Sequence, residues 1–164
     1  MTKPKINPPL RTVDIIIEAL AAICLIYMMV QIIVEYPSLT QSVPTHFGAG
    51  GSPDAWGDKS SLLIIPVVTI VLYVGLTVLN KYPHIFNYPV PITEQNASRQ
   101  YQYAKSLLST LKFTTSGLFL YIQLQTVSVA KQIQSGLGTY FLVMIVIGSF
   151  IPIIIYFVIA AKNK

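Results

Sequence analysis

The chain has 164 residues, of which 53% are apolar and only 10% are charged, and its mean hydropathy is +0.61. Soluble globular domains carry charge at about a quarter of their positions, so this composition excludes an ordinary soluble domain and predicts an integral membrane protein. The net charge of +5 does not indicate nucleic-acid binding, because the basic residues flank apolar runs and form no patch with interleaved aromatic side chains.

Four apolar segments are long enough to cross a bilayer, which takes roughly 20 residues of helix. The first follows a basic, proline-containing arm, and the third is diluted by Ser, Thr and Gln, which usually face other helices in a membrane bundle. We therefore predict a single membrane domain over residues 1–164 with an all-α fold, a bundle of four transmembrane helices. The predicted helices are residues 14–34, 62–79, 113–130 and 138–161.

Two loops of different character connect these segments. Residues 35–60 are rich in Gly and Pro, whereas residues 80–112 begin with an extended, proline-broken stretch. Residues 93–112 contain neither Gly nor Pro. They predict a helix that either lies along the membrane surface or continues directly into the third span.

The basic residues predict the orientation in the membrane. With a cytoplasmic N-terminus, Lys59 and Lys131 lie outside, and the other nine of the 11 Lys and Arg residues lie inside. Such a bias agrees with the positive-inside rule for short loops. We expect a protein of the bacterial cytoplasmic membrane with both termini in the cytoplasm, residues 35–60 as the outer loop and residues 80–112 as the cytoplasmic loop.

The outer loop is the candidate functional element. Pro44 favours an extended entry, and the sequence Ser-Pro-Asp at residues 52–54 is a strong turn signal, so we expect a compact set of turns. Phe47 and Trp56 are aromatic residues suited to the membrane interface.

Three side chains of this loop, His46, Asp54 and Asp58, offer one imidazole and two carboxylates. They could hold a divalent cation such as zinc or manganese, although their spacing matches no established metal motif. They could also act in acid-base catalysis, or they could hydrogen-bond loop amides and pair with Lys59. The sequence leaves these three interpretations open.

The loop resembles that of a bacterial membrane family of unknown function with the pattern P-x-H-F…G-x-P-D-x-W-G-x-K. The matching residues are Pro44, His46, Phe47, Gly51, Pro53, Asp54, Trp56, Gly57 and Lys59. Residues 87–101 are also similar to the cytoplasmic loop of short family members. The family is distantly related to the immunity and signalling proteins that protect a sporulating bacterium from its own secreted toxin. The resemblance implies that the outer loop recognises a toxin, a peptide or another protein.

Polar side chains inside the predicted spans form a second set of candidates. Glu18 lies about one turn past Asp14, where it either faces the bundle and the membrane interface or serves in proton or ligand binding. Gln31 is predicted to meet Gln123 or Gln125 of the third span in an interhelical hydrogen bond.

The cytoplasmic loop predicts a basic and aromatic surface, which contacts anionic lipid headgroups or docks a cytoplasmic partner. The candidate residues of this surface are Asn87, Tyr88, Arg99, Tyr101 and Lys105.

The function favoured by these observations is that of a non-enzymatic multi-pass membrane protein in immunity or signal transduction, which contacts membrane lipids and a protein partner or a second copy of itself. One alternative is an accessory subunit of a larger membrane complex. Another is a membrane enzyme that uses His46 and Asp54, with a divalent metal or without one. No other cofactor is expected.

Overall fold

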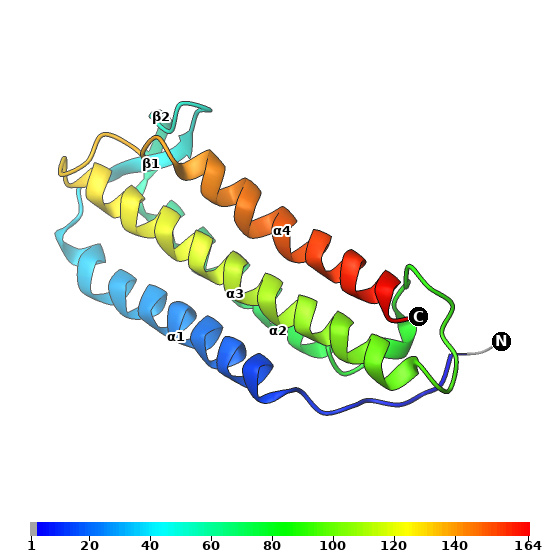
Figure 1. Cartoon of the computed structure of the whole chain (residues 1–164). Coiled ribbons are helices and arrows are strands. Elements are labelled where there is room, and N and C mark those ends of the chain that lie inside the picture. Colours follow the sequence, from blue (N-terminus) through cyan, green and yellow to red (C-terminus); the bar gives the residue numbers. More distant parts are fainter. Residues whose placement is uncertain (1–2) are drawn as a thin grey trace.

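The computed structural model describes residues 3–164, and within them it shows four α-helices and one two-stranded hairpin. Short 3-10 turns at Tyr36–Ser38, Lys59–Leu63 and Pro83–Ile85 connect these elements. The helices are α1 (Thr12–Glu35), α2 (Ile64–Leu79), α3 (Ala97–Ala130) and α4 (Phe141–Lys162). The strands are β1 (Ser42–Phe47) and β2 (Pro53–Asp58), both between α1 and α2 (Figure 1).

Three helical segments within residues 3–164 are long and apolar enough to cross a membrane. These segments, Thr12–Ser38, Lys59–Leu79 and Phe141–Lys162, correspond to the first, second and fourth predicted spans. The third predicted span lies in the second half of α3 and is not among them. The structure therefore supports a membrane location through three apolar helices.

Helix α3 is one continuous helix of 34 residues, so the helix predicted in the cytoplasmic loop does continue into the third apolar segment. It packs against α1, α2 and α4 and lies between α1 and α4 (Figure 1). No residue from 100 to 130 is exposed, whereas α1, α2 and α4 carry many exposed large apolar side chains. The three apolar helices thus shield the polar residues of α3, as the composition of this segment predicted.

Residues 42–58 form an antiparallel β-hairpin, so the prediction of an all-α fold with only turns in this loop is wrong. Ser42 lies opposite Asp58 and Pro44 lies opposite Trp56, with a register irregularity on either side of His46. Proline is tolerated because in a sheet of two strands both strands are edges, and an edge strand needs only some of its N–H groups for pairing.

The hairpin is attached to the helical bundle at two points. Near its base, Val43 is fully buried in a cluster with Ile32, Leu39, Leu62 and Val127. At its turn, Gly51 has a φ of +78° and its carbonyl accepts a hydrogen bond of 2.7 Å from the Leu137 N–H in the connection between α3 and α4. The hairpin is therefore a fixed part of this end of the bundle.

The N-terminal arm lies at the opposite end of the bundle, where the C-terminus is also found (Figure 1). Carbonyl oxygens of the arm face α3, because Tyr101 Oη donates to the Pro4 oxygen at 3.0 Å and Lys105 Nζ donates to the Pro8 oxygen at 2.6 Å. At the start of α1, Arg11 binds Asp14 at 3.0 Å, which places a negative charge in the first turn, where the helix dipole favours it. The arm is thus folded onto the helices.

Candidate functional site

The hairpin brings His46 and Asp54 into direct contact. The Nδ1 atom of His46 on β1 lies 2.6 Å from Oδ1 of Asp54 on β2, and the two side chains are 68% and 52% exposed. A Cβ atom on Gly48 would lie 3.1 Å from Asp54 Oδ2, so a glycine leaves room for the carboxylate beside the turn. This contact orients the imidazole ring at the surface, where the pair can hydrogen-bond a partner.

Asp58 does not join this pair, which corrects the predicted set of three metal ligands. It lies opposite Ser42 at the far end of the ladder from His46, and its Oδ1 accepts a hydrogen bond of 2.8 Å from the Ser60 N–H. The hydrogen bond to Ser60 holds the pKa of Asp58 below its usual value. Within residues 3–164, no three His, Cys, Asp or Glu side chains gather to form a metal site.

The other hairpin candidates divide between surface and interior. Trp56 is 52% exposed, whereas Pro44 is buried and Phe47 is half-buried beside a cavity of about 230 Å³. Lys59 does not pair with an aspartate, because its Nζ lies 4.8 Å from the centre of the Tyr36 ring in a cation-π contact. Of the nine residues in the family-like pattern, His46, Asp54 and Trp56 are therefore the exposed ones, and the others support the hairpin.

Gly57 and Gly51 serve the packing of the hairpin. A Cβ atom on Gly57 would lie only 2.8 Å from Thr45 Cγ2 across the ladder. Gly51 is buried and has the positive φ that favours glycine. Pro53 pairs with Phe47 at the start of β2. These residues determine the shape of the hairpin.

The predicted contact between Gln31 and Gln123 is confirmed. Gln123 Nε2 donates to Gln31 Oε1 at 2.6 Å and to the Met28 carbonyl at 2.9 Å, and Gln123 is fully buried. Gln125 takes no part in this contact, and its Oε1 is buried without a hydrogen-bond partner among the residues that the structure describes.

We expect Gln123→Leu to lower the free energy of unfolding in detergent by about 1–2 kcal/mol, because Gln31 and the Met28 carbonyl lose their donor inside the bundle. Gln125→Leu is the matched control and should be neutral or stabilising, because both variants remove an unsatisfied buried acceptor but only Gln123→Leu also removes hydrogen bonds to α1. Chemical unfolding in mixed micelles gives both values, and equal losses in the two variants would contradict this assignment.

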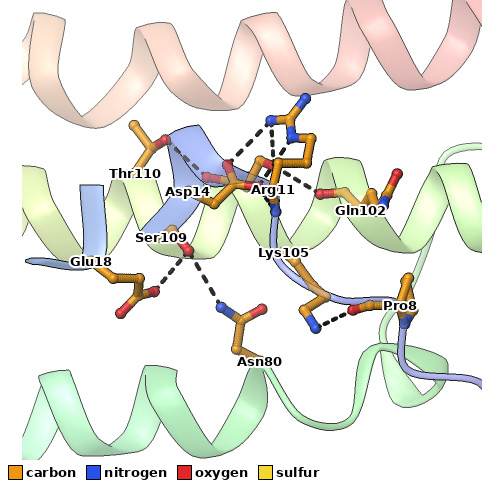
Figure 2. A network of polar contacts seen from close by, with 10 residues as sticks. Pro8, Arg11, Asp14, Glu18, Asn80, Gln102, Lys105, Ser109 and Thr110 are labelled. Atoms are coloured by element: carbon orange, nitrogen blue, oxygen red, sulfur yellow. Dashed lines mark hydrogen bonds and ion pairs between the residues drawn. The ribbon is translucent and has the colours of Figure 1, made fainter. Parts of the chain in front are cut away.

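Glu18 is part of a buried polar cluster between α1, α2 and α3. Its Oε2 lies 2.5 Å from Nζ of Lys112, which is 1% exposed, and its Oε1 accepts a hydrogen bond of 2.7 Å from Ser109. Lys112 also donates to Thr77 Oγ1 at 2.8 Å. Figure 2 shows Ser109 between Glu18 and Asn80, whose Nδ2 lies 3.4 Å from the Ser109 hydroxyl. The structure therefore places Glu18 on the side of α1 that faces the bundle, and a role in proton or ligand binding stays a prediction.

Sequence reasoning singled out Glu18 but did not assign its partner. Lys112 comes directly before the third predicted span, where a lysine is usually taken as a flanking charge. The position in the membrane could have indicated this pair, because Glu18 and Lys112 each lie near the start of an apolar segment at the same end of the predicted bundle.

The predicted basic and aromatic surface of the cytoplasmic loop is mostly covered in the structure. Tyr101 is fully buried and Lys105 is 5% exposed, because the N-terminal arm lies over them. The Tyr88 ring lies beside the Tyr101 ring, tilted by 32° with centroids 5.4 Å apart, and burial raises the pKa of the Tyr88 hydroxyl. Arg99 donates to the carbonyls of the last two residues, at 3.3 and 3.4 Å.

Asn87 remains on the surface of this loop. The five candidates therefore do not form one exposed patch, since two of them lie in the interior.

Comparison with known proteins gives two similarities. Residues 22–70 match the family described as a domain of unknown function, DUF1648. An uncharacterized protein of the archaeon Archaeoglobus fulgidus is 38% identical over 65 residues, which cover 35% of this chain and 36% of that protein. The chain thus matches about a third of the length of this relative. No solved structure matches the chain.

The family match includes most of α1, the whole hairpin and the start of α2. The similarity therefore covers the segment that holds His46 and Asp54, and it supports a relation to a membrane-type family of unknown function.

Proposed function

We propose that the protein is a non-enzymatic multi-pass membrane protein whose hairpin recognises a peptide or protein partner, such as a toxin, in immunity or signal transduction. The observation that carries this proposal is the fixed hairpin with exposed functional groups. Val43 and Gly51 hold the hairpin on the bundle, while the His46–Asp54 pair and Trp56 remain exposed. A rigid surface that presents an aromatic ring and hydrogen-bonding groups loses little conformational entropy when a partner binds.

The proposed topology has four membrane spans, both termini in the cytoplasm and the hairpin outside. The second half of α3 is the least apolar span, but α1, α2 and α4 surround it, so its polar groups need not face lipid. The excess of nine Lys and Arg over two supports a cytoplasmic position for the end of the bundle that holds the termini. The corresponding location is the cytoplasmic membrane.

The test is site-specific photo-crosslinking from position 56 in the native membrane. We expect a discrete protein adduct whose yield falls at least about tenfold in His46→Ala and in Asp54→Ala, as for residues that dominate a binding interface. Either substitution breaks the hydrogen bond between His46 and Asp54, and neither changes a residue of the buried cluster around Val43.

Ser52→Ala is the matched control, because Ser52 is exposed in the turn of the same hairpin and its side chain makes no hydrogen bond within residues 3–164. All variants should keep the unfolding midpoint of the original protein. An unchanged adduct in both His46→Ala and Asp54→Ala would rule out recognition through this pair.

A further inference from the structure

A cavity of about 290 Å³ opens at the end of the bundle that holds the termini. It lies where α1 begins and α2 ends, at the level of the lipid headgroups if these helices span the membrane as proposed. The N-terminal arm, α1, α2 and α3 all contribute to its wall. The lining residues are Asn7, Leu10, Glu18, Thr77, Asn80, Lys81, Lys105 and Lys112.

The wall of this cavity carries more positive than negative charge. Lys81, Lys105 and Lys112 face one carboxylate, that of Glu18, which is already paired with Lys112. Lys105 is 5% exposed and its Nζ is held by two neutral oxygens, Asn7 Oδ1 at 2.7 Å and the Pro8 carbonyl at 2.6 Å. Asp14, the nearest further carboxylate along α1, acts on Lys105 through its charge but makes its ion pair with Arg11.

A buried cation whose hydrogen bonds all go to neutral groups is costly, and a further anion beside it lowers this cost. The residues that line the cavity therefore suit an anionic ligand more than a cationic or neutral one.

Asn80 adds a second observation that points to a ligand. The residue is 6% exposed, and its Oδ1 has no hydrogen-bond partner among residues 3–164. Buried polar atoms of this kind normally have a partner. Figure 2 shows Asn80 and Lys105 in the space between α2 and α3, with Ser109 linking Asn80 to Glu18. A ligand with both an anionic oxygen and a hydroxyl group would satisfy Lys105 and Asn80 together.

The remaining wall is mainly carbon, from Leu10 and the alkyl stems of the lysines. A site with apolar walls, an excess of lysines and a place at the headgroup level fits the head of a phospholipid, since basic pockets between membrane helices bind anionic headgroups.

We propose that this cavity binds the phosphate group of an anionic molecule, with the phosphate near Lys81 and Lys105 and a hydroxyl group of the same molecule donating to Asn80. An anionic phospholipid with a glycerol headgroup supplies this chemistry from the membrane, and inorganic phosphate supplies its anionic part from solution. The site is separate from the hairpin, so it does not depend on the function proposed for His46 and Asp54.

Native mass spectrometry of the delipidated full chain tests the proposal. The protein is titrated with phosphatidylglycerol and, separately, with phosphatidylcholine of the same acyl chains. We expect a preference for phosphatidylglycerol that falls about fivefold in Lys81→Gln and in Lys105→Gln, the effect of one charge near a headgroup. Lys81 is exposed and its replacement leaves the buried cluster intact, so this variant is informative even if Lys105→Gln folds poorly.

Lys162→Gln is the matched control, because Lys162 is exposed at the same end of the bundle but does not line the cavity. A second arm measures the shift of the unfolding midpoint with inorganic phosphate, with sulfate-free chloride buffer of equal ionic strength as reference. The site binds a soluble phosphate if inorganic phosphate shifts the unfolding midpoint, Lys81→Gln abolishes this shift, and the protein shows no preference for phosphatidylglycerol.

Lipid preference that depends on Lys81 and not on Lys162 assigns the site to phospholipid. The proposal is overturned if neither ligand binds selectively, or if Lys162→Gln reduces binding as much as Lys81→Gln.

Discussion

Lys112→Met is expected to lower the free energy of unfolding by about 3–5 kcal/mol, the usual loss when one member of a buried ion pair is removed. Lys112 is 1% exposed and contacts Glu18, Thr77 and, at 4.7 Å, the ring of Tyr73. Methionine has a similar length, so the variant removes the charge and leaves little empty space. Of the two hydrogen bonds to the Glu18 carboxylate, only the one from the Ser109 hydroxyl then remains.

Two comparisons separate charge from packing in this experiment. The double variant Glu18→Gln with Lys112→Met should recover at least half of the loss, because no unpaired charge remains. Lys131→Met is the matched control at the other end of the bundle, where Lys131 pairs with Glu35 and both side chains are about 30% exposed.

Lys131→Met should lower the free energy of unfolding by less than about 1 kcal/mol, as is typical when an exposed ion pair is broken. Unfolding in mixed micelles gives all three values. If the double variant were as unstable as Lys112→Met alone, the charge of Glu18 would not be the cause.

Gly136→Ala should release the hairpin turn from the connection between α3 and α4. A Cβ atom at this position would lie 2.2 Å from the Gly51 carbonyl oxygen and 3.2 Å from the Ser52 Cα, and both are backbone atoms that cannot rotate away. The two segments must move apart, which breaks the hydrogen bond from the Leu137 N–H to Gly51. We expect the free energy of unfolding to fall by about 1–3 kcal/mol, the range for an overpacked position.

Hydrogen exchange of the Leu137 amide is the direct measurement, since its protection depends on the Gly51 carbonyl. Gly50→Ala is the matched control, because a Cβ atom there meets nothing within 4 Å and its φ is not in the left-handed region. It should leave both the exchange rate and the stability unchanged. Protection of Leu137 that survives in Gly136→Ala would mean that the turn tolerates a side chain between the two segments.

The bundle could be predicted from the sequence because hydropathy and side-chain polarity act locally. Apolar runs determined the first, second and fourth helices, and the Ser, Thr and Gln residues of residues 113–130 correctly predicted that this segment is buried among the others. The contact of Gln31 with Gln123 followed from their similar depth. The hairpin was missed because Pro44 and Pro53 lie within its strands, and proline usually argues against a strand.

The long-range contacts could not be predicted in the same way. Tyr101 and Lys105 are residue types that are common at a membrane surface, but the N-terminal arm covers them. The prolines of the arm prevent a regular helix, so its backbone carbonyl groups are free to accept hydrogen bonds from these two side chains. The pairing of His46 with Asp54 follows from the hairpin register, in which Pro44 lies opposite Trp56, so it could not be predicted while this loop was expected to hold only turns. Asp58 looked equivalent to Asp54 in the sequence, yet the ladder separates them.

The position of α3 has a consequence for how the chain enters the membrane during synthesis. Among the proposed spans, the second half of α3 is the one whose composition gives the weakest drive to partition into lipid alone. Its polar side chains are shielded by packing against α1, α2 and α4, and α4 is made last. If α3 spans the membrane as proposed, we expect the earlier α1 and α2 to hold it at the translocation site until α4 is made and completes the bundle.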